Sequence, residues 1–143
     1  MAKFTIYTDG AARGNPGASA SGFSVYDSSG KKIHARSHYN GKRTNNFAEY
    51  TAVIRALEWC ADNLQNPNEA EILLYSDSEL IVRQLTGEYK IKNKAMLLLN
   101  ESVKELIPKF KSISFHNLPR EDEHIAEVDR GLNRLLDEIY NRE

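Results

Sequence analysis

The hydrophobic pattern changes its period along the chain, and this change constrains the fold more than any other feature. Residues 3–8 place successive side chains on alternate sides, which is typical of a strand. Residues 22–26 and 32–39 are also strand-like, and the turn-forming residues between them predict an antiparallel meander. From residue 47 onward, apolar side chains recur at helical spacing instead. We therefore expect a sheet that is completed by helical crossovers.

The second half of the chain alternates helices with strands. The continuous apolar run of residues 72–75 suits a strand buried on both faces, as parallel strands are, and residues 111–118 alternate like a last strand. Helical spacing covers the residues 47–64, 94–107 and 125–140, and a short helix is expected through residue 85. This order predicts an α/β fold with a mixed five-stranded sheet, in which parallel strands extend the meander and helices cover both faces. Residues 1–143 are interpreted as one domain.

Composition narrows the class of protein. The single cysteine, Cys60, lies in an apolar helical run and is expected to be a buried hydrophobe, so a disulfide or cysteine metal site is not expected. No apolar run is long enough for a signal peptide or a membrane span, and a cytoplasmic protein is predicted. Net charge is -1, but residues 81–111 carry seven basic and three acidic side chains, which suits either a phosphate-binding patch or a solvated helix face.

Three acidic residues occupy positions that folding alone does not require. Asp9 is expected to end the first strand and Asp77 the buried strand, while Glu49 lies near the start of the first long helix. If the two strands are neighbours, their carboxylates converge at one edge of the sheet. Like charges held close together repel each other unless a cation neutralises them, and Mg²⁺ prefers carboxylate oxygens. The pattern therefore suggests a magnesium site.

Each of these residues also has a purely structural interpretation. Glu49 follows Asn46, the expected helix N-cap, by three residues, as in a capping box. Asp77 or its neighbour Ser76 can cap the short helix, and Asp9 before a glycine can be a turn residue. Only the combination of all three acidic residues favours a catalytic site.

Four short motifs resemble those of type 1 ribonuclease H, and they occur in the family's order and spacing. The resemblance as a whole extends over residues 4–136. The motifs are Thr8-Asp9-Gly10-Ala11-Ala12 with Gly14-Asn15-Pro16-Gly17, then Thr44-Asn45-Asn46-Phe47-Ala48-Glu49-Tyr50, then Ser76-Asp77-Ser78, and finally Asp129-Arg130-Gly131-Leu132-Asn133. Gly87-Glu88-Tyr89-Lys90 and Leu118-Pro119-Arg120-Glu121 further resemble the compact archaeal-type and short bacterial members.

The resemblance implies an endonuclease that hydrolyses the RNA strand of an RNA–DNA hybrid and leaves 5′-phosphate and 3′-hydroxyl ends. It also implies two Mg²⁺ ions, or Mn²⁺ in their place, which activate a water and stabilise the leaving oxygen. The implied catalytic and metal-binding residues are Asp9, Glu49, Asp77 and Asp129. Glu127 is the alternative to Asp129 as the fourth carboxylate.

Substrate-binding positions also follow from the resemblance. A protein distinguishes RNA from DNA by the 2′-hydroxyl, which requires hydrogen-bonding groups along the minor groove. The positions implied for substrate binding are Gly10, Ala11, Ala12, Asn15, Thr44, Asn45, Asn46 and Ser78, of which Thr44 would hold a phosphate of the DNA strand. The expected contacts to the nucleic-acid backbone are Lys90, Lys92 and Lys94. His124, in the expected loop before the last helix, is the candidate for product release.

The sequence departs from the family pattern at one position, and two alternative functions are also considered. Glu79 occupies a position where the family often has glutamine, which puts a negative charge beside the expected groove. A nuclease on the same fold that also cuts double-stranded RNA is the first alternative, and a non-catalytic nucleic-acid-binding module is the second. The expected partner is the hybrid; no protein partner is implied, and a monomer is predicted.

Overall fold

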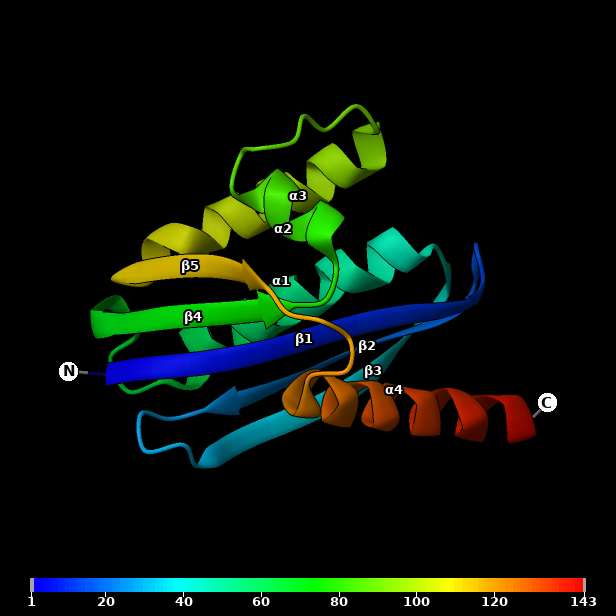
Figure 1. Cartoon of the computed structure of the whole chain (residues 1–143), viewed down its shortest axis with the longest axis horizontal. Coiled ribbons are helices and arrows are strands. Elements are labelled where there is room, and N and C mark those ends of the chain that lie inside the picture. The colour runs from blue at the N-terminus through cyan, green and yellow to red at the C-terminus, as the bar shows by residue number, and fades with distance from the viewer. Residues whose placement is uncertain (1, 143) are drawn as a thin grey trace.

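Five strands form one mixed sheet in the order β3-β2-β1-β4-β5 (Figure 1). The computed structural model describes residues 2–142. The first three strands form the predicted antiparallel meander, whereas the last two run parallel to the first. Their bounds are β1 (Ala2–Gly14), β2 (Gly17–Tyr26), β3 (Lys32–Arg43), β4 (Ala70–Ser76) and β5 (Ser112–Asn117). The predicted fold class is confirmed.

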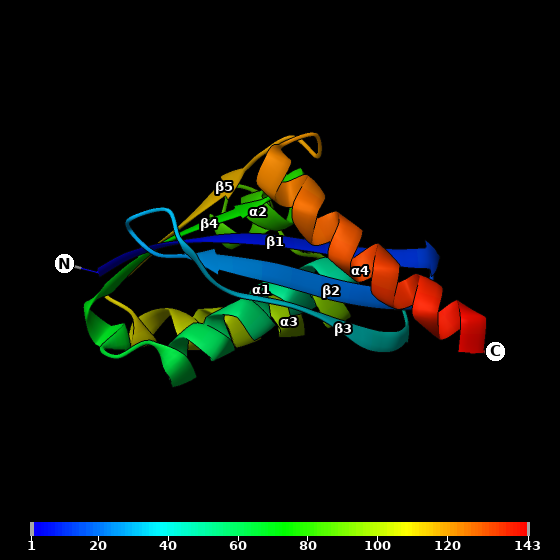
Figure 2. The same ribbon diagram turned by 90° about the horizontal axis from the view of Figure 1, so that it is seen from below.

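Helices lie on both faces of this sheet. Figure 2 shows α4 on one face, where it packs against the meander, and α1 with α3 on the other. The bounds are α1 (Asn45–Asn63), α2 (Glu79–Leu85), α3 (Lys94–Leu106) and α4 (Glu123–Arg142), with 3-10 turns η1 (Pro67–Glu69) and η2 (Ile107–Lys109). Within residues 2–142, none of the helices combines the length and the hydropathy needed to cross a bilayer.

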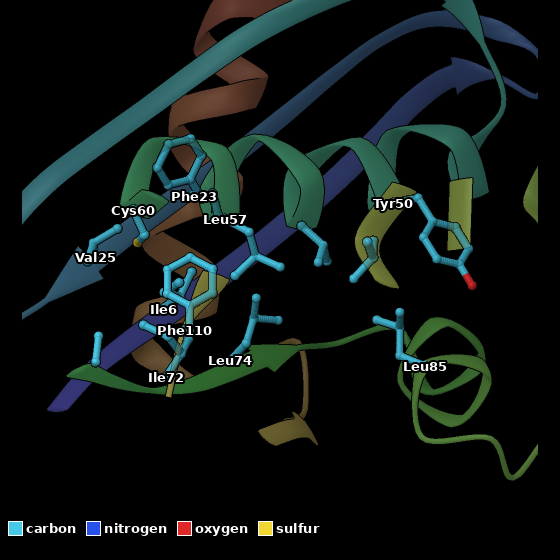
Figure 3. Packing of buried hydrophobic residues seen from close by; sticks show 14 of the residues in the cluster. Ile6, Phe23, Val25, Tyr50, Leu57, Cys60, Ile72, Leu74, Leu85 and Phe110 are labelled. Atoms are coloured by element: carbon cyan, nitrogen blue, oxygen red, sulfur yellow. The ribbon is translucent and has the colours of Figure 1, made fainter. Parts of the chain in front are cut away.

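The main core lies between the sheet and α1 (Figure 3). Leu57 of α1 faces Leu74 of β4, and both side chains are buried, as are those of Cys60 and Ile72. Cys60 is the buried hydrophobe that its setting predicts, and burial raises the pKa of its thiol to about 12. A smaller cluster of Ala20, Leu132 and Leu136 joins α4 to the opposite face.

The expectation that residues 72–75 are buried on both faces was wrong. Burial alternates along β4, so that Ile72 and Leu74 are buried whereas Leu73 and Tyr75 are only half-buried. The reason is the position of α4, which covers β1, β2 and β3 and leaves this face of β4 partly open. Local sequence does not reveal how far a helix extends across a sheet.

The small residues after position 9 extend the first two strands beyond their predicted bounds into a long hairpin. β1 pairs with β4 only as far as Thr8, which lies opposite Ser76, but it continues alongside β2 to Gly14. The prediction that Asp9 ends the first strand was therefore wrong. Asp9 lies within β1, at the point where the neighbouring strand has ended.

The helix starts differ from the predicted ones by one or two residues. Thr44, not Asn46, is the N-cap of α1, and Ser78, not Ser76 or Asp77, is the N-cap of α2. In each case the hydroxyl oxygen accepts a hydrogen bond from a backbone N–H of the first turn. Neighbouring short polar residues can all serve as caps, so the path of the chain decides which one does.

Candidate active site

The three acidic residues singled out in the sequence converge beyond the carboxyl end of β4. One carboxylate oxygen each from Asp9, Glu49 and Asp77 lies within 4.8 Å of the others. Asp9 comes from β1, Asp77 directly follows β4, and Glu49 comes from α1. Because β1 and β4 are parallel neighbours, the predicted meeting of these two carboxylates is confirmed.

Glu49 reaches the sheet because Gly10 of β1 has no side chain and lets α1 approach closely. A Cβ atom on Gly10 would lie 2.4 Å from the backbone carbon of Ala48 and 2.6 Å from the nitrogen of Glu49. The backbone N–H of Gly10 donates a hydrogen bond to Glu49 Oε1 over 3.1 Å. The Ser76 hydroxyl donates to Glu49 Oε2 over 3.5 Å. Both carboxylate oxygens of Glu49 are thus held in place by the sheet.

Two residues that the sequence analysis did not single out fix the start of α1. The Ser21 hydroxyl of β2 donates a hydrogen bond to the carbonyl oxygen of Ala48 over 2.6 Å. Asn40 of β3 donates to that hydroxyl over 2.8 Å. Ser21 is completely buried. A serine directly before the predicted strand of residues 22–26 is the local signal, and it does not identify the helix that the hydroxyl contacts.

The electrostatics of this carboxylate cluster favour cation binding. Burial, followed by the charges of Glu49 and Asp77, raises the pKa of Asp9. Burial and the charge of Asp77 likewise raise the pKa of Glu49. Burial raises the pKa of Asp77 as well, although the Arg120 guanidinium opposes this rise. The protein therefore leaves most of the negative charge uncompensated, and a hard divalent cation fits such a set of oxygen donors.

Asp129 of α4 lies beside this cluster. A hydrogen bond to Asp129, and its charge, further raise the pKa of Asp9. The side-chain amide of Asn133, one turn along α4, donates to Asp129 Oδ1 over 3.0 Å. Arg13 in turn donates to Asn133 Oδ1 over 3.3 Å and pairs with Asp137 over 2.7 Å. The β1–β2 hairpin thus holds the helix turn that carries Asp129.

Glu127, the alternative fourth carboxylate, forms an ion pair with Lys32 of β3. The hydrogen bond from this ammonium group lowers the pKa of Glu127. Asp129, by contrast, is close enough to Asp9 to raise the pKa of Asp9. The geometry therefore brings Asp129, rather than Glu127, to the carboxylate cluster.

Comparison with known proteins agrees with this arrangement. A family profile described as "Reverse transcriptase-like" matches residues 7–128. A solved structure of an RNase H1 isolated from compost is 38% identical and superimposes with a TM-score of 0.90, over 98% of this chain and 99% of that one. The chain belongs to the type 1 ribonuclease H family.

One further structure of this compost enzyme and one further relative bear on function. The compost enzyme has also been solved in complex with an RNA/DNA hybrid, and that structure is 35% identical over 93% of this chain and 99% of that one, with a TM-score of 0.83. Ribonuclease HI of Halobacterium salinarum is 35% identical over 92% of this chain and 63% of its own length. The chain spans only 36% of the length of its curated mycobacterial relatives.

The predicted substrate-binding residues lie around the β1–β2 hairpin tip and the start of α1. The backbone N–H of Ala12 donates to Asn45 Oδ1 over 2.8 Å, and that of Asn45 donates to Asn15 Oδ1 over 2.9 Å. Thr44 and Asn46 line a cavity of about 370 Å³ together with Asn15. The Ser78 hydroxyl, by contrast, caps α2. The hydrogen bonds between Ala12, Asn15 and Asn45 hold the hairpin tip against the first turn of α1.

His124 lies in the first turn of α4, so the prediction that it lies in a loop was wrong. Asp122 Oδ1 accepts hydrogen bonds from the backbone N–H groups of His124 and Ile125, which starts the helix two residues earlier than expected. The imidazole stacks on Tyr7 with ring centroids 4.4 Å apart. It is also hydrogen-bonded to the Tyr26 hydroxyl over 3.3 Å. A role of His124 in product release stays a prediction.

The remaining predicted contacts lie on the surface. Glu79 pairs with Arg83 over 2.8 Å, so its carboxylate is partly neutralised within α2. Lys90 and Lys92 are exposed in the segment between α2 and α3, and the exposed Lys94 begins α3. These three ammonium groups are free to contact phosphates in solution.

Proposed function

We propose that this protein is a metal-dependent endonuclease that hydrolyses the RNA strand of RNA–DNA hybrids. The observation that carries the proposal is the convergence of Asp9, Glu49 and Asp77 from three separate elements, with Asp129 beside them. A phosphate binder gains nothing from a negative cluster, because phosphate contacts require positive charge. A non-catalytic module therefore explains the cluster poorly, whereas metal-assisted hydrolysis requires it.

The four carboxylates would hold two divalent cations, Mg²⁺ or Mn²⁺. Bound there, the ions would lower the pKa of a coordinated water and stabilise charge on the leaving 3′ oxygen of the RNA. The protein's own contribution is preorganisation, since Gly10 and Ser76 fix both oxygens of Glu49 before a ligand arrives. The products would carry 5′-phosphate and 3′-hydroxyl ends.

Selectivity for RNA would come from the hairpin tip and the first turn of α1. Asn15 and Asn45 each use the side-chain oxygen in a hydrogen bond to backbone within this region. Among residues 2–142, neither side chain donates a hydrogen bond through its Nδ2 group. Both amide groups are exposed, and both can donate to a 2′-hydroxyl or a base edge in the minor groove. Thr44 at this rim would contact a phosphate of the DNA strand.

The experiment is a cleavage assay with matched substrates. The purified protein is incubated with end-labelled RNA–DNA hybrid, double-stranded RNA and double-stranded DNA, in Mg²⁺, in Mn²⁺ and in a chelator. We expect cleavage of the RNA strand of the hybrid alone, and none with chelator. Cleavage of double-stranded RNA at a similar rate would favour the broader nuclease instead.

Asp77→Asn is the decisive variant, because it keeps the size of the side chain and removes its charge. We expect a folded protein without measurable cleavage, whereas the matched variant Glu101→Gln, on the exposed surface of α3, should cleave normally. Full activity of folded Asp77→Asn would refute the assignment.

Three expectations on domain organisation, oligomeric state and cellular location accompany this proposal. We propose that residues 1–143 act as one domain, as a monomer, and in the cytoplasm. Sedimentation of the purified chain, with and without hybrid, tests the monomeric state; fluorescence of a tagged chain in cells tests the location.

A further inference from the structure

A second cavity lies away from the carboxylate cluster, between β3 and the C-terminal half of α1. Its volume is about 460 Å³, which is within the range of pockets that hold small organic ligands, about 300–1,000 Å³. β3 is an edge strand, so its side chains on this face have no further strand beside them. Arg36 and His38 of β3 line one wall, and Arg55 and Trp59 of α1 line the other.

Charge is segregated along this cavity. The His34 ring stacks on Trp59 with centroids 4.2 Å apart, which places that part of β3 beside the middle of the cavity. His38 lies four residues beyond His34 on β3, which corresponds to about 13 Å along the strand. Its neighbour on α1 is Arg55, which lies one turn before Trp59. Both acidic side chains that line the cavity follow Arg55 along α1, Glu58 by three residues and Asp62 by seven, so Arg55 lies at the end away from Asp62. One end of the cavity is therefore basic.

The basic end lacks partners of its own. Among the residues that the structure describes, neither Arg36 nor Arg55 forms an ion pair with a carboxylate. The Nε2 atom of His38 is buried and has no hydrogen-bond partner within residues 2–142, and neither has that of His34. A buried imidazole nitrogen without a partner costs free energy.

We propose that the Arg36, His38 and Arg55 end of this cavity binds the phosphate of a phosphomonoester. Guanidinium groups on two facing walls can bracket a tetrahedral oxyanion with several hydrogen bonds. The half-buried Trp59 and the buried Phe23 also line the cavity and offer apolar contact to an organic group attached to the phosphate. The cavity shares no residue with the carboxylate cluster, so the inference is independent of the proposed nuclease function.

The state of His38 provides the measurement. Burial, followed by the charges of Arg55 and Arg36, lowers the pKa of His38 to about 4. A bound phosphate would favour the imidazolium and raise this pKa. The other titratable groups that line the cavity, Glu58 and Asp62, are on α1 with Arg55 and are present in every titration.

The test is an NMR titration of the histidine ring signals in a chelator, which prevents binding through metal at the carboxylates. The probes are inorganic phosphate, 5′-AMP and adenosine, and His38→Gln assigns the signal. We expect phosphate and 5′-AMP to raise the pKa of His38, with 5′-AMP the tighter ligand, and adenosine to leave it unchanged. No rise with either phosphate, equal binding of adenosine, or 5′-AMP no tighter than phosphate would each overturn the proposal.

A double variant locates the site. Arg36→Gln combined with Arg55→Gln should weaken 5′-AMP binding by about tenfold or more for each charge-assisted hydrogen bond that the substitutions remove. Lys109→Gln combined with Arg134→Gln removes the same charge from exposed positions elsewhere and should bind 5′-AMP normally. Both double variants should cleave hybrid at the unaltered rate. Equal 5′-AMP binding by the two double variants would place the phosphate elsewhere on the molecule.

Discussion

The backbone N–H of Gly10 and the carboxylate of Glu49 are joined by a hydrogen bond of 3.1 Å, although 39 positions separate them in the sequence. This contact ties the middle of β1 to the first part of α1. It requires the close approach that only a residue without a side chain permits, because Gly10 faces the backbone of Ala48. The orientation of Glu49 thus depends on the absence of a Cβ atom at Gly10.

Gly10→Ala tests this dependence. The added Cβ would meet backbone atoms of α1 at 2.4 to 2.6 Å, and such overpacking typically costs about 1–3 kcal/mol. We expect a lower free energy of unfolding in urea and slower hybrid cleavage. Gly131→Ala is the matched control, because its Cβ would meet only the Ser37 hydroxyl at 3.0 Å. Equal behaviour of the two variants would contradict the packing argument.

The carboxylate cluster should make the metal-free protein less stable as pH rises. Burial and neighbouring charges raise the folded-state pKa of Asp9 and Glu49, so the folded protein keeps protons that the unfolded chain has already lost. Where the folded state binds more protons, the free energy of unfolding falls with increasing pH. In chelator, thermal unfolding should therefore occur at lower temperature at about pH 8 than at about pH 7. Added Mg²⁺ should reverse this loss.

Asp9→Asn tests how much the carboxylate cluster contributes to this loss of stability with increasing pH. Removing one of the mutually repelling charges should raise the melting temperature in chelator, flatten its dependence on pH and abolish stabilisation by Mg²⁺. Differential scanning calorimetry at both pH values measures all three effects. A variant that is less stable than the parent protein in chelator at pH 8 would show that Asp9 is not under electrostatic strain.

Asp129 and Glu127 should differ sharply in their effect on cleavage. Asp129 lies beside Asp9, so Asp129→Asn should lower kcat for hybrid cleavage by about tenfold or more, the usual scale for groups that support a metal site. Glu127 pairs with Lys32 at a partly exposed position, where such pairs contribute about 1 kcal/mol or less. Glu127→Gln should cleave at nearly the parental rate. The reverse ranking in steady-state kinetics would make Glu127 the fourth ligand.

Asn133 should act on metal affinity through Asp129. Its amide group donates to Asp129 Oδ1 over 3.0 Å. Loss of such a supporting hydrogen bond typically weakens metal binding by about 10–100-fold. We expect Asn133→Ala to require more Mg²⁺ for half-maximal cleavage. Asp137→Asn is the control, since it disrupts only the ion pair with Arg13 on the other side of the hairpin contact. Identical Mg²⁺ dependence of both variants would exclude a positioning role.

Salt should weaken hybrid binding through the exposed lysines between α2 and α3. Each phosphate contact contributes a slope of about -0.9 to the logarithm of affinity against the logarithm of salt concentration. Replacing Lys90, Lys92 and Lys94 by glutamine should therefore lower the affinity and reduce the magnitude of this slope. Fluorescence anisotropy with labelled hybrid, in a chelator, measures both. An unchanged slope would mean that the patch does not contact the nucleic acid.

Part of the active-site geometry could be predicted because it depends on strand direction. Asp9 lies in β1 and Asp77 directly follows the adjacent parallel strand β4, so their convergence follows from topology alone. The choice between Asp129 and Glu127 is different, because residues two apart on a helix point about 200° apart around its axis. Only the rotation of α4 on the sheet, which the packing of Leu132 and Leu136 against Ala20 fixes, decides which carboxylate faces the cluster.

The sequence by itself determined the architecture and the candidate metal ligands, because the period of the apolar residues specifies strands or helices and carboxylate oxygens are the donors that hard cations prefer. Tertiary structure decided how each carboxylate is held. Hydrogen bonds from Ser21, Ser76 and Asn133 reach across the fold to α1 or along one turn of α4. Such contacts depend on the distances between packed elements, and a linear pattern of residue types contains no measure of those distances.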